Sequence, residues 1–76
     1  HTDVVVSELG QRVQEALTRL PPEVRIPLVL HELEDWPYQE IASLLRLRLG
    51  TVKSRIHRGR KRLKVELDDY WNGDRR

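Results

Sequence analysis

The sequence predicts an all-α fold of four helices, of which the third is short and the fourth is long and basic. Apolar residues recur three and four positions apart along most of the chain, which is the spacing of amphipathic helices. No segment alternates apolar and polar residues as a half-buried strand would. All four prolines fall between residues 21 and 37, at or near the breaks between these periodic segments.

The length of 76 residues allows a single domain with a small core. We expect residues 1–70 to form this domain and residues 71–76 to form a polar C-terminal tail. Because the first residue is His rather than Met, we expect the chain to be a piece of a longer protein, with His1 and Thr2 as a tag remnant.

The first helix is predicted over residues 6–20. Its apolar stripe consists of Val6, Leu9, Val13, Ala16, Leu17 and Leu20. Gly10 weakens this helix without ending it, because glycine costs about 1 kcal/mol relative to alanine in a helix interior. The following "LPP" ends the helix, since proline cannot continue a helix interior.

The second helix is predicted over residues 22–33, with Pro22 in its first turn. The residues expected to be buried are Ile26, Val29, Leu30 and Leu33, flanked by Val24 and Leu28. Pro27 lies near the start of this helix and leaves two outcomes open. In the first turn its missing amide costs little, whereas a deeper position predicts a kink.

The third helix, "YQEIASLL", covers residues 38–45, with Pro37 at its start and Asp35 or Trp36 near the cap. Tyr38, Ile41 and Leu45 are expected in the core, and Trp36 is expected to cover the junction between helices. After the short turn "RLRLG", the fourth helix is predicted from Thr51, as its N-cap, to about Asp69.

Charge is distributed very unevenly along the chain. Residues 46–64 contain nine Arg or Lys and no acid, whereas residues 1–45 contain three basic and eight acidic side chains. Projected at about 100° per residue, the fourth helix places Val52, Ile56, Gly59, Leu63 and Leu67 on a core stripe. A continuous face of Lys, Arg, Ser and His side chains lies on the opposite side. A run of basic residues on a helix is often only a solvated face. Here, however, the basic run follows a short helix and a tight turn.

A short helix, a turn and a second helix with a basic face form a helix-turn-helix, whose second helix enters the major groove of DNA. Residues near the start of that helix penetrate deepest, so the candidates for base contacts are Thr51, Lys53, Ser54, His57 and Arg58. Basic residues in the turn and at the margins are expected to contact phosphates: Arg46, Arg48, Arg55, Arg60, Lys61 and Arg62.

Residues 16–64 resemble region 4 of bacterial sigma factors of the sigma-70 family, particularly the extracytoplasmic-function group. The matching segments are "LPPEVR", "YQEIASLL" and "GTVKSRIHRGRKRL", in the family's order and spacing. The resemblance implies a four-helix, region 4-like domain that binds the promoter -35 element in transcription initiation. It also implies docking on the flap of the RNA polymerase beta subunit, through the apolar and acidic surface of the first two helices.

The resemblance assigns Lys53, Ser54, His57 and Arg58 to base-contacting positions, and Tyr38 and Gln39 to positions against the DNA backbone. It implies a cytoplasmic bacterial protein, and an anti-sigma factor as a further partner. Two departures from the family pattern have structural consequences. Arg46 stands where the family usually has glycine, so a positive φ there costs about 1 kcal/mol or more. Pro37 replaces the usual Ser cap, so the cap hydrogen bond must come from elsewhere or be lost.

Composition and motifs exclude several other classes of protein. Without cysteine there is no disulfide or thiolate site, and no signal peptide or membrane-length apolar run is present. His1, His31 and His57 are too scattered for a metal motif, and "HELED" lacks the second His of H-E-x-x-H. We therefore predict no enzyme, no catalytic residue, no metal and no cofactor. Glu32, Glu34 and Asp35 are expected to be solvent-facing charges.

Two functional alternatives remain at this point. The first is the helix-turn-helix of a response-regulator-type transcription factor, which has a similar recognition helix; the "LPPEVR" segment and the long basic continuation favour the sigma interpretation. The second is a helical module whose main role is to bind an anti-sigma factor or another regulatory protein. A pure interaction module predicts no salt-sensitive DNA binding, whereas the sigma interpretation predicts several phosphate contacts and a steep salt dependence.

Overall fold

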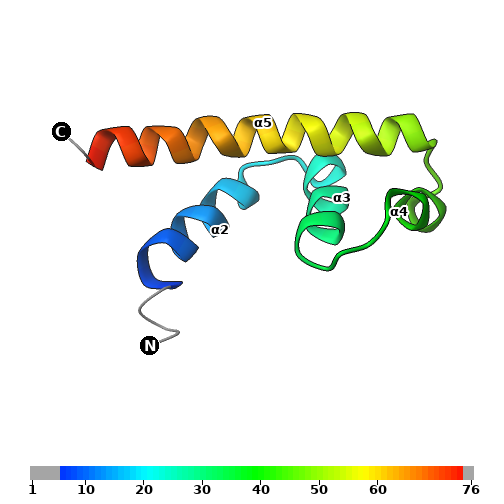
Figure 1. The fold of residues 1–76 in the computed structure, drawn as a ribbon, viewed down its shortest axis with the longest axis horizontal. Coiled ribbons are helices and arrows are strands. Elements are labelled where there is room, and N and C mark those ends of the chain that lie inside the picture. Colours follow the sequence, from blue (N-terminus) through cyan, green and yellow to red (C-terminus); the bar gives the residue numbers. More distant parts are fainter. Residues whose placement is uncertain (1–5, 75–76) are drawn as a thin grey trace.

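The computed structural model describes the backbone of residues 6–74 and the side chains of residues 8–68. Within these residues the chain forms a π-helical turn, η1 (Val6–Gly10), and four α-helices: α2 (Gln11–Thr18), α3 (Pro22–Glu32), α4 (Tyr38–Leu45) and α5 (Leu49–Asp74). The 26 residues of α5 span about 39 Å at 1.5 Å per residue. The other three helices all lie on one side of α5 (Figure 1). The expected all-α fold is therefore confirmed.

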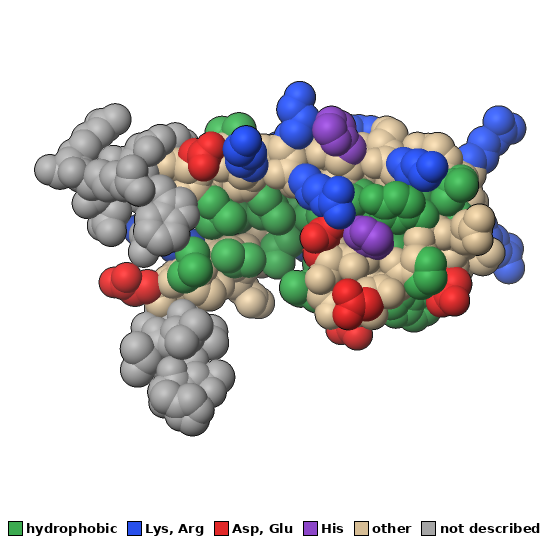
Figure 2. All heavy atoms as spheres, in the orientation of Figure 1, with side chains coloured by type: hydrophobic (Ala, Val, Ile, Leu, Met, Phe, Trp, Pro, Cys, Tyr) green, Lys and Arg blue, Asp and Glu red, His purple; other side chains and the backbone are tan. Residues whose placement is uncertain are grey.

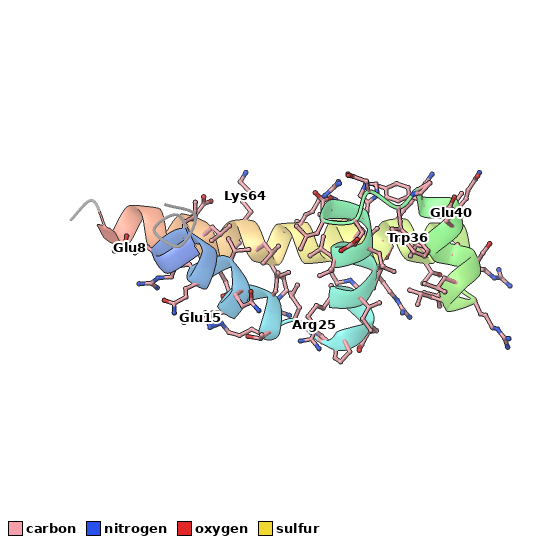
Figure 3. All side chains as sticks on the ribbon, turned by 90° about the horizontal axis from the view of Figure 1, so that it is seen from below. Glu8, Glu15, Arg25, Trp36, Glu40 and Lys64 are labelled. Carbon is pink, nitrogen blue, oxygen red and sulfur yellow. The ribbon has the colours of Figure 1, made fainter. Side chains whose placement is uncertain are left out.

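The first predicted helix is divided into η1 and α2, and Gly10 lies at the join as the N-cap of α2. Of the predicted stripe, Ala16 and Leu20 are buried, whereas Leu9 is 41% exposed. The exposure of Leu9 corrects the prediction, and its physical reason is that this end of the first helical segment diverges from α5 (Figure 1). The side chain of Val6 lies outside the described residues. Arg25 joins α2 to α3 by donating from Nη1 to the carbonyl oxygens of Thr18 and Leu20, at 3.3 and 3.4 Å (Figure 3).

The buried face of α3 differs from the predicted one. Val24, Pro27 and Leu28 are buried, whereas Ile26 is 46% and Leu33 is 65% exposed. Val29 and Leu30 are partly buried. The prediction was wrong because residues 26–30 are all apolar and surround the helix, so their periodicity does not select one face.

Pro22 is the first residue of α3, as predicted, and Pro21 precedes it in an extended conformation with φ −61° and ψ 149°. Pro27 lies inside the helix rather than in its first turn, and α3 continues through it. The ring of Pro27 is buried in the domain, so apolar packing offsets the missing hydrogen bond.

Helix α4 has the predicted bounds, but Pro37 itself occupies the N-cap and provides no side-chain cap bond. At the other end, Arg46 is left-handed, with φ 58° and ψ 46°. The amide of Leu47 donates to the carbonyl of Ala42 at 2.9 Å, which closes a Schellman-type turn. The positive φ considered from the sequence is therefore present, and it is an arginine that adopts it.

Helix α5 begins two residues before the predicted start, so Thr51 lies inside its first turn and is not the N-cap. It also extends beyond the predicted end near Asp69, because no proline interrupts the chain after residue 37. Residues 71–74 of the expected tail are helical, and residues 75–76 lie outside the described part. The domain limits at residues 70 and 71 remain a prediction.

The core lies where α3 and α4 pack against the first half of α5. It contains Leu20, Val24, Leu28, Ile41, Val52 and Ile56. Trp36, Tyr38 and Leu45 are partly buried against this cluster, and Trp36 covers the junction between α3 and α4 (Figure 3), as predicted. Gly59 allows close approach of α3, since a Cβ atom there would lie 3.0 Å from side-chain atoms of both Leu28 and Val24.

Candidate nucleic-acid interface

Helices α4 and α5 and the three residues between them form the predicted helix-turn-helix. The core stripe of α5 is confirmed at Val52, Ile56 and Gly59, which are buried, while Leu63 and Leu67 are partly buried. Burial of this stripe orients the opposite face of α5 towards solvent. Most of the predicted base-contacting side chains are accordingly exposed: Lys53, Ser54, His57 and Arg58. Thr51 is only partly buried and lies in the first turn of the helix.

Positive and negative side chains lie largely on different sides of the molecule. In Figure 2 many of the visible Lys and Arg side chains lie along α5, whereas most acidic side chains lie over the lower surface formed by the shorter helices. Lys64 points away from the body of the domain (Figure 3). The fold therefore converts the charge blocks of the sequence into a cationic face, which is the electrostatic feature of a nucleic-acid interface.

The start of α4 lies beside the start of α5. Pro37, Tyr38 and Gln39 line a shallow hollow of about 270 Å³ together with Leu49 and Lys53. Gln39 is exposed and Tyr38 is partly buried. The two α4 residues assigned to the DNA backbone are thus placed next to Lys53, the first base-contacting candidate with an exposed side chain.

The turn arginines Arg46 and Arg48 are exposed, and Arg55 is partly buried. Arg55 lines a second hollow, of about 190 Å³, with residues of α3 and the turn that include Ile26 and Leu47. Because Arg55 lies about 160° around the helix from Lys53, it flanks the base-contacting face at one margin. Lys61 and Arg62 are exposed about two turns further along α5 than Arg55.

Arg60 differs from the other phosphate candidates because it is already paired. Its Nε donates to Oε2 of Glu32 at 2.7 Å, and its Nη2 donates to the same oxygen. The Glu32 carboxylate raises the pKa of Arg60, partial burial opposes this shift, and Tyr38 adds to the increase. Glu32 is exposed as predicted but is not a free charge. The two partners are 28 positions apart in the chain, and this separation explains why no local pattern predicted the pair.

His31 has a structural partner that the sequence did not reveal. Its Nδ1 lies 2.9 Å from the carbonyl oxygen of Trp36, and its ring centroid lies 4.4 Å from that of Tyr38. Among the described residues, no group of three or more His, Cys, Asp or Glu side chains is placed to hold a metal ion. None of the described helices is both long enough and apolar enough to cross a membrane.

Comparison with known proteins matches the sequence of this chain to a family. The family model described as "Sigma-70, region 4" matches residues 10–63. The chain is 52% identical over 61 residues to the ECF RNA polymerase sigma factor SigE of Mycolicibacterium smegmatis, covering 80% of this chain and 24% of that protein. It is 41% identical over 68 residues to the ECF RNA polymerase sigma factor SigW of Bacillus subtilis, covering 88% of this chain and 36% of that protein.

It is also 41% identical over 54 residues to the ECF RNA polymerase sigma-E factor of Escherichia coli K12, covering 71% of this chain and 28% of that protein. The chain therefore spans about a quarter to a third of the length of these relatives.

Proposed function

Because the chain belongs to the region 4 family of sigma-70 factors, we propose that it recognises the -35 element of promoters within an extracytoplasmic-function sigma factor. The observation that carries this proposal is the exposed face of α5 beside the start of α4. Lys53, Ser54, His57 and Arg58 lie on one side of a helix whose opposite side is buried in the core. The family match also favours a sigma factor over the response-regulator alternative.

Each exposed side chain on this face has a chemistry suited to the major groove. Arg58 and Lys53 can donate to guanine O6 and N7, and Ser54 and His57 can donate or accept at other base edges. Thr51, in the first turn, completes the set. Arg46, Arg48 and Arg55, together with Lys61, Arg62, Tyr38 and Gln39, would hold the phosphates on either side and supply affinity without sequence information.

The second part of the proposal is docking on RNA polymerase, through the flap of its beta subunit. The surface of η1, α2 and α3 supports this role because it exposes Leu9, Ile26 and Leu33 among acidic side chains. Figure 3 shows Glu8 and Glu15 on this part of the molecule. An anti-sigma factor would regulate the same domain by covering part of these surfaces. The role is one of positioning in the bacterial cytoplasm and involves no bond chemistry, cofactor or metal.

Fluorescence anisotropy with a randomised duplex pool tests the DNA-binding part of the proposal. Binding is measured at two salt concentrations, and the bound duplexes are sequenced. We expect enrichment of one short motif and an affinity that falls steeply with salt, with a log–log slope of about −0.9 per phosphate contact. A single helix in one groove forms a small interface, so weak binding by the isolated chain is expected.

Three substitutions make the test specific. Arg58→Ala and Lys53→Ala should blur the enriched motif, each by about 1–3 kcal/mol of lost discrimination. Arg19→Ala removes an exposed arginine that lies just after α2, outside the helix-turn-helix, and should leave the motif unchanged. Salt-sensitive binding without enrichment of any motif would indicate that α5 is a basic helix that binds DNA without sequence specificity. No binding even at low salt would contradict the proposal and favour a protein partner.

A further inference from the structure

The pair between Arg60 and Glu32 joins two parts of the chain that the helix-turn-helix must keep in register. Glu32 is the last residue of α3, and Arg60 lies at the centre of α5. Both side chains remain accessible, with 49% of Arg60 and 39% of Glu32 exposed. An ion pair that is this exposed adds little to global stability, because water screens it and two long side chains lose freedom. Its effect is therefore expected to be local and geometric.

The same end of α3 also contacts the start of α4. His31, next to Glu32, reaches the Trp36 carbonyl through Nδ1 and lies against the Tyr38 ring. The amide of Trp36 donates to the Leu30 carbonyl at 3.0 Å, which folds the connecting loop back onto α3. The end of α3, this loop and the first residue of α4 are thus linked by directional contacts, and Arg60 attaches this group to α5.

The chemistry of the pair argues against a phosphate contact by Arg60. Two of its donor nitrogens, Nε and Nη2, already point at one carboxylate oxygen. A guanidinium neutralised by an adjacent carboxylate attracts little of the counterion atmosphere that basic residues release on binding DNA. A phosphate would also have to approach the Glu32 carboxylate, which has the same sign of charge.

We propose that Arg60 is a positioning residue, which fixes the start of α4 against α5 through Glu32 and does not itself bind DNA. This inference rests on the proposed function, since the geometry that it maintains is the placement of Tyr38 and Gln39 beside Lys53. It changes the role of Arg60 from a phosphate contact to a determinant of how accurately the two helices present their side chains.

A charge-exchange experiment separates these two roles. The variants are Glu32→Arg, Arg60→Glu, and the double variant that carries both and keeps the net charge of the chain. The measured quantity is the ratio of affinities for the enriched duplex and a shuffled duplex, at one salt concentration. For a positioning role we expect each single change to lower this ratio about five- to tenfold, and the double variant to recover most of it.

The phosphate-contact role predicts a different result. Arg60→Glu would weaken binding to both duplexes, and the double variant would stay as weak, because a carboxylate would still occupy position 60. Lack of recovery in the double variant therefore overturns the positioning role while leaving the proposed function intact. If the unaltered chain does not discriminate between duplexes, the proposed function fails, and the positioning role fails with it.

The ion pair between Arg19 and Glu66 is a matched control. Arg19 donates from Nε to Oε1 of Glu66 at 3.0 Å and joins the end of the α2 segment to the second half of α5. Exchanging these two charges should not change the discrimination ratio, because Arg19 follows α2 and Glu66 lies in the second half of α5, beyond the base-contacting residues. Arg60→Lys adds a further readout, since it keeps the charge but lacks the fork that reaches Glu32. A positioning role predicts reduced discrimination with an unchanged salt slope; full discrimination would contradict it.

Discussion

Replacing Arg46 by glycine should stabilise the fold, although it removes a side chain from the proposed interface. Arg46 has φ 58° and ψ 46°, a left-handed conformation that costs an L-residue about 1–2 kcal/mol. Glycine avoids this cost. It also gives the unfolded chain more conformational freedom, which offsets about 0.4–1 kcal/mol of the gain in stability. The expected net stabilisation for Arg46→Gly is therefore about 0.5–1 kcal/mol. In a domain of this size that raises Tm by roughly 2–8 °C.

Thermal and urea unfolding followed by circular dichroism measure this change. Arg48→Gly is the matched control, because Arg48 is an exposed arginine of the same turn but is not among the non-glycine residues with positive φ. We expect that control to leave Tm unchanged or to lower it. Although Arg46→Gly should raise Tm, it should lower the affinity for DNA and make the salt slope shallower by about 0.9. If Arg46→Gly melts no higher than Arg48→Gly, the left-handed conformation of Arg46 does not strain the fold.

Three further predictions concern the core, the helix crossing and base recognition. Ile41→Ala removes a side chain with 0% exposure and should lower the free energy of unfolding by about 2–5 kcal/mol, measured by urea titration. In the same titration Leu44→Ala, at a position that is 56% exposed, should lower the free energy of unfolding far less. Gly59→Val should destabilise the fold by about 1–3 kcal/mol through overpacking against α3. Gly50→Ala should raise Tm, because a Cβ atom at position 50 meets nothing within 4 Å and alanine favours a helix over glycine. Arg58→Ala should raise Kd for the enriched duplex more than for a shuffled one, and an equal rise for both would assign Arg58 to the phosphates.

The bounds of the helices were predictable where proline or a clear stripe defined them. Pro22 and Pro37 determined the starts of α3 and α4, because proline is favoured at a helix start and disfavoured in its interior. The stripe of α5 was predictable from Val52 and Ile56, since the large apolar side chains between residues 51 and 64 all lie on one side of that helix. The exposed positions of the candidate base contacts follow directly from that stripe.

Other features depended on contacts that no local pattern contains. The buried face of α3 depends on which side meets α5, and the apolar run around Pro27 does not reveal it. The partly exposed position of Leu9 depends on the direction in which the first helical segment leaves the domain. The pairing of Glu32 with Arg60 requires two segments to meet in space, so each residue alone appeared to be an ordinary exposed charge.

The separation of charge explains how a chain with a net charge of only +2 can present a strongly basic face. The molecule extends 43 × 26 × 16 Å, so acids on the surface away from α5 lie more than one Debye length, about 10 Å at 0.1 M salt, from DNA held on its basic face. At that distance these acids are largely screened, and they subtract little from the attraction between the basic face and DNA. Glu32 lies closer than these acids, since it reaches α5 directly and pairs with Arg60. A carboxylate in that position weakens a purely electrostatic interface, and the pair is therefore better explained by the geometry that it maintains.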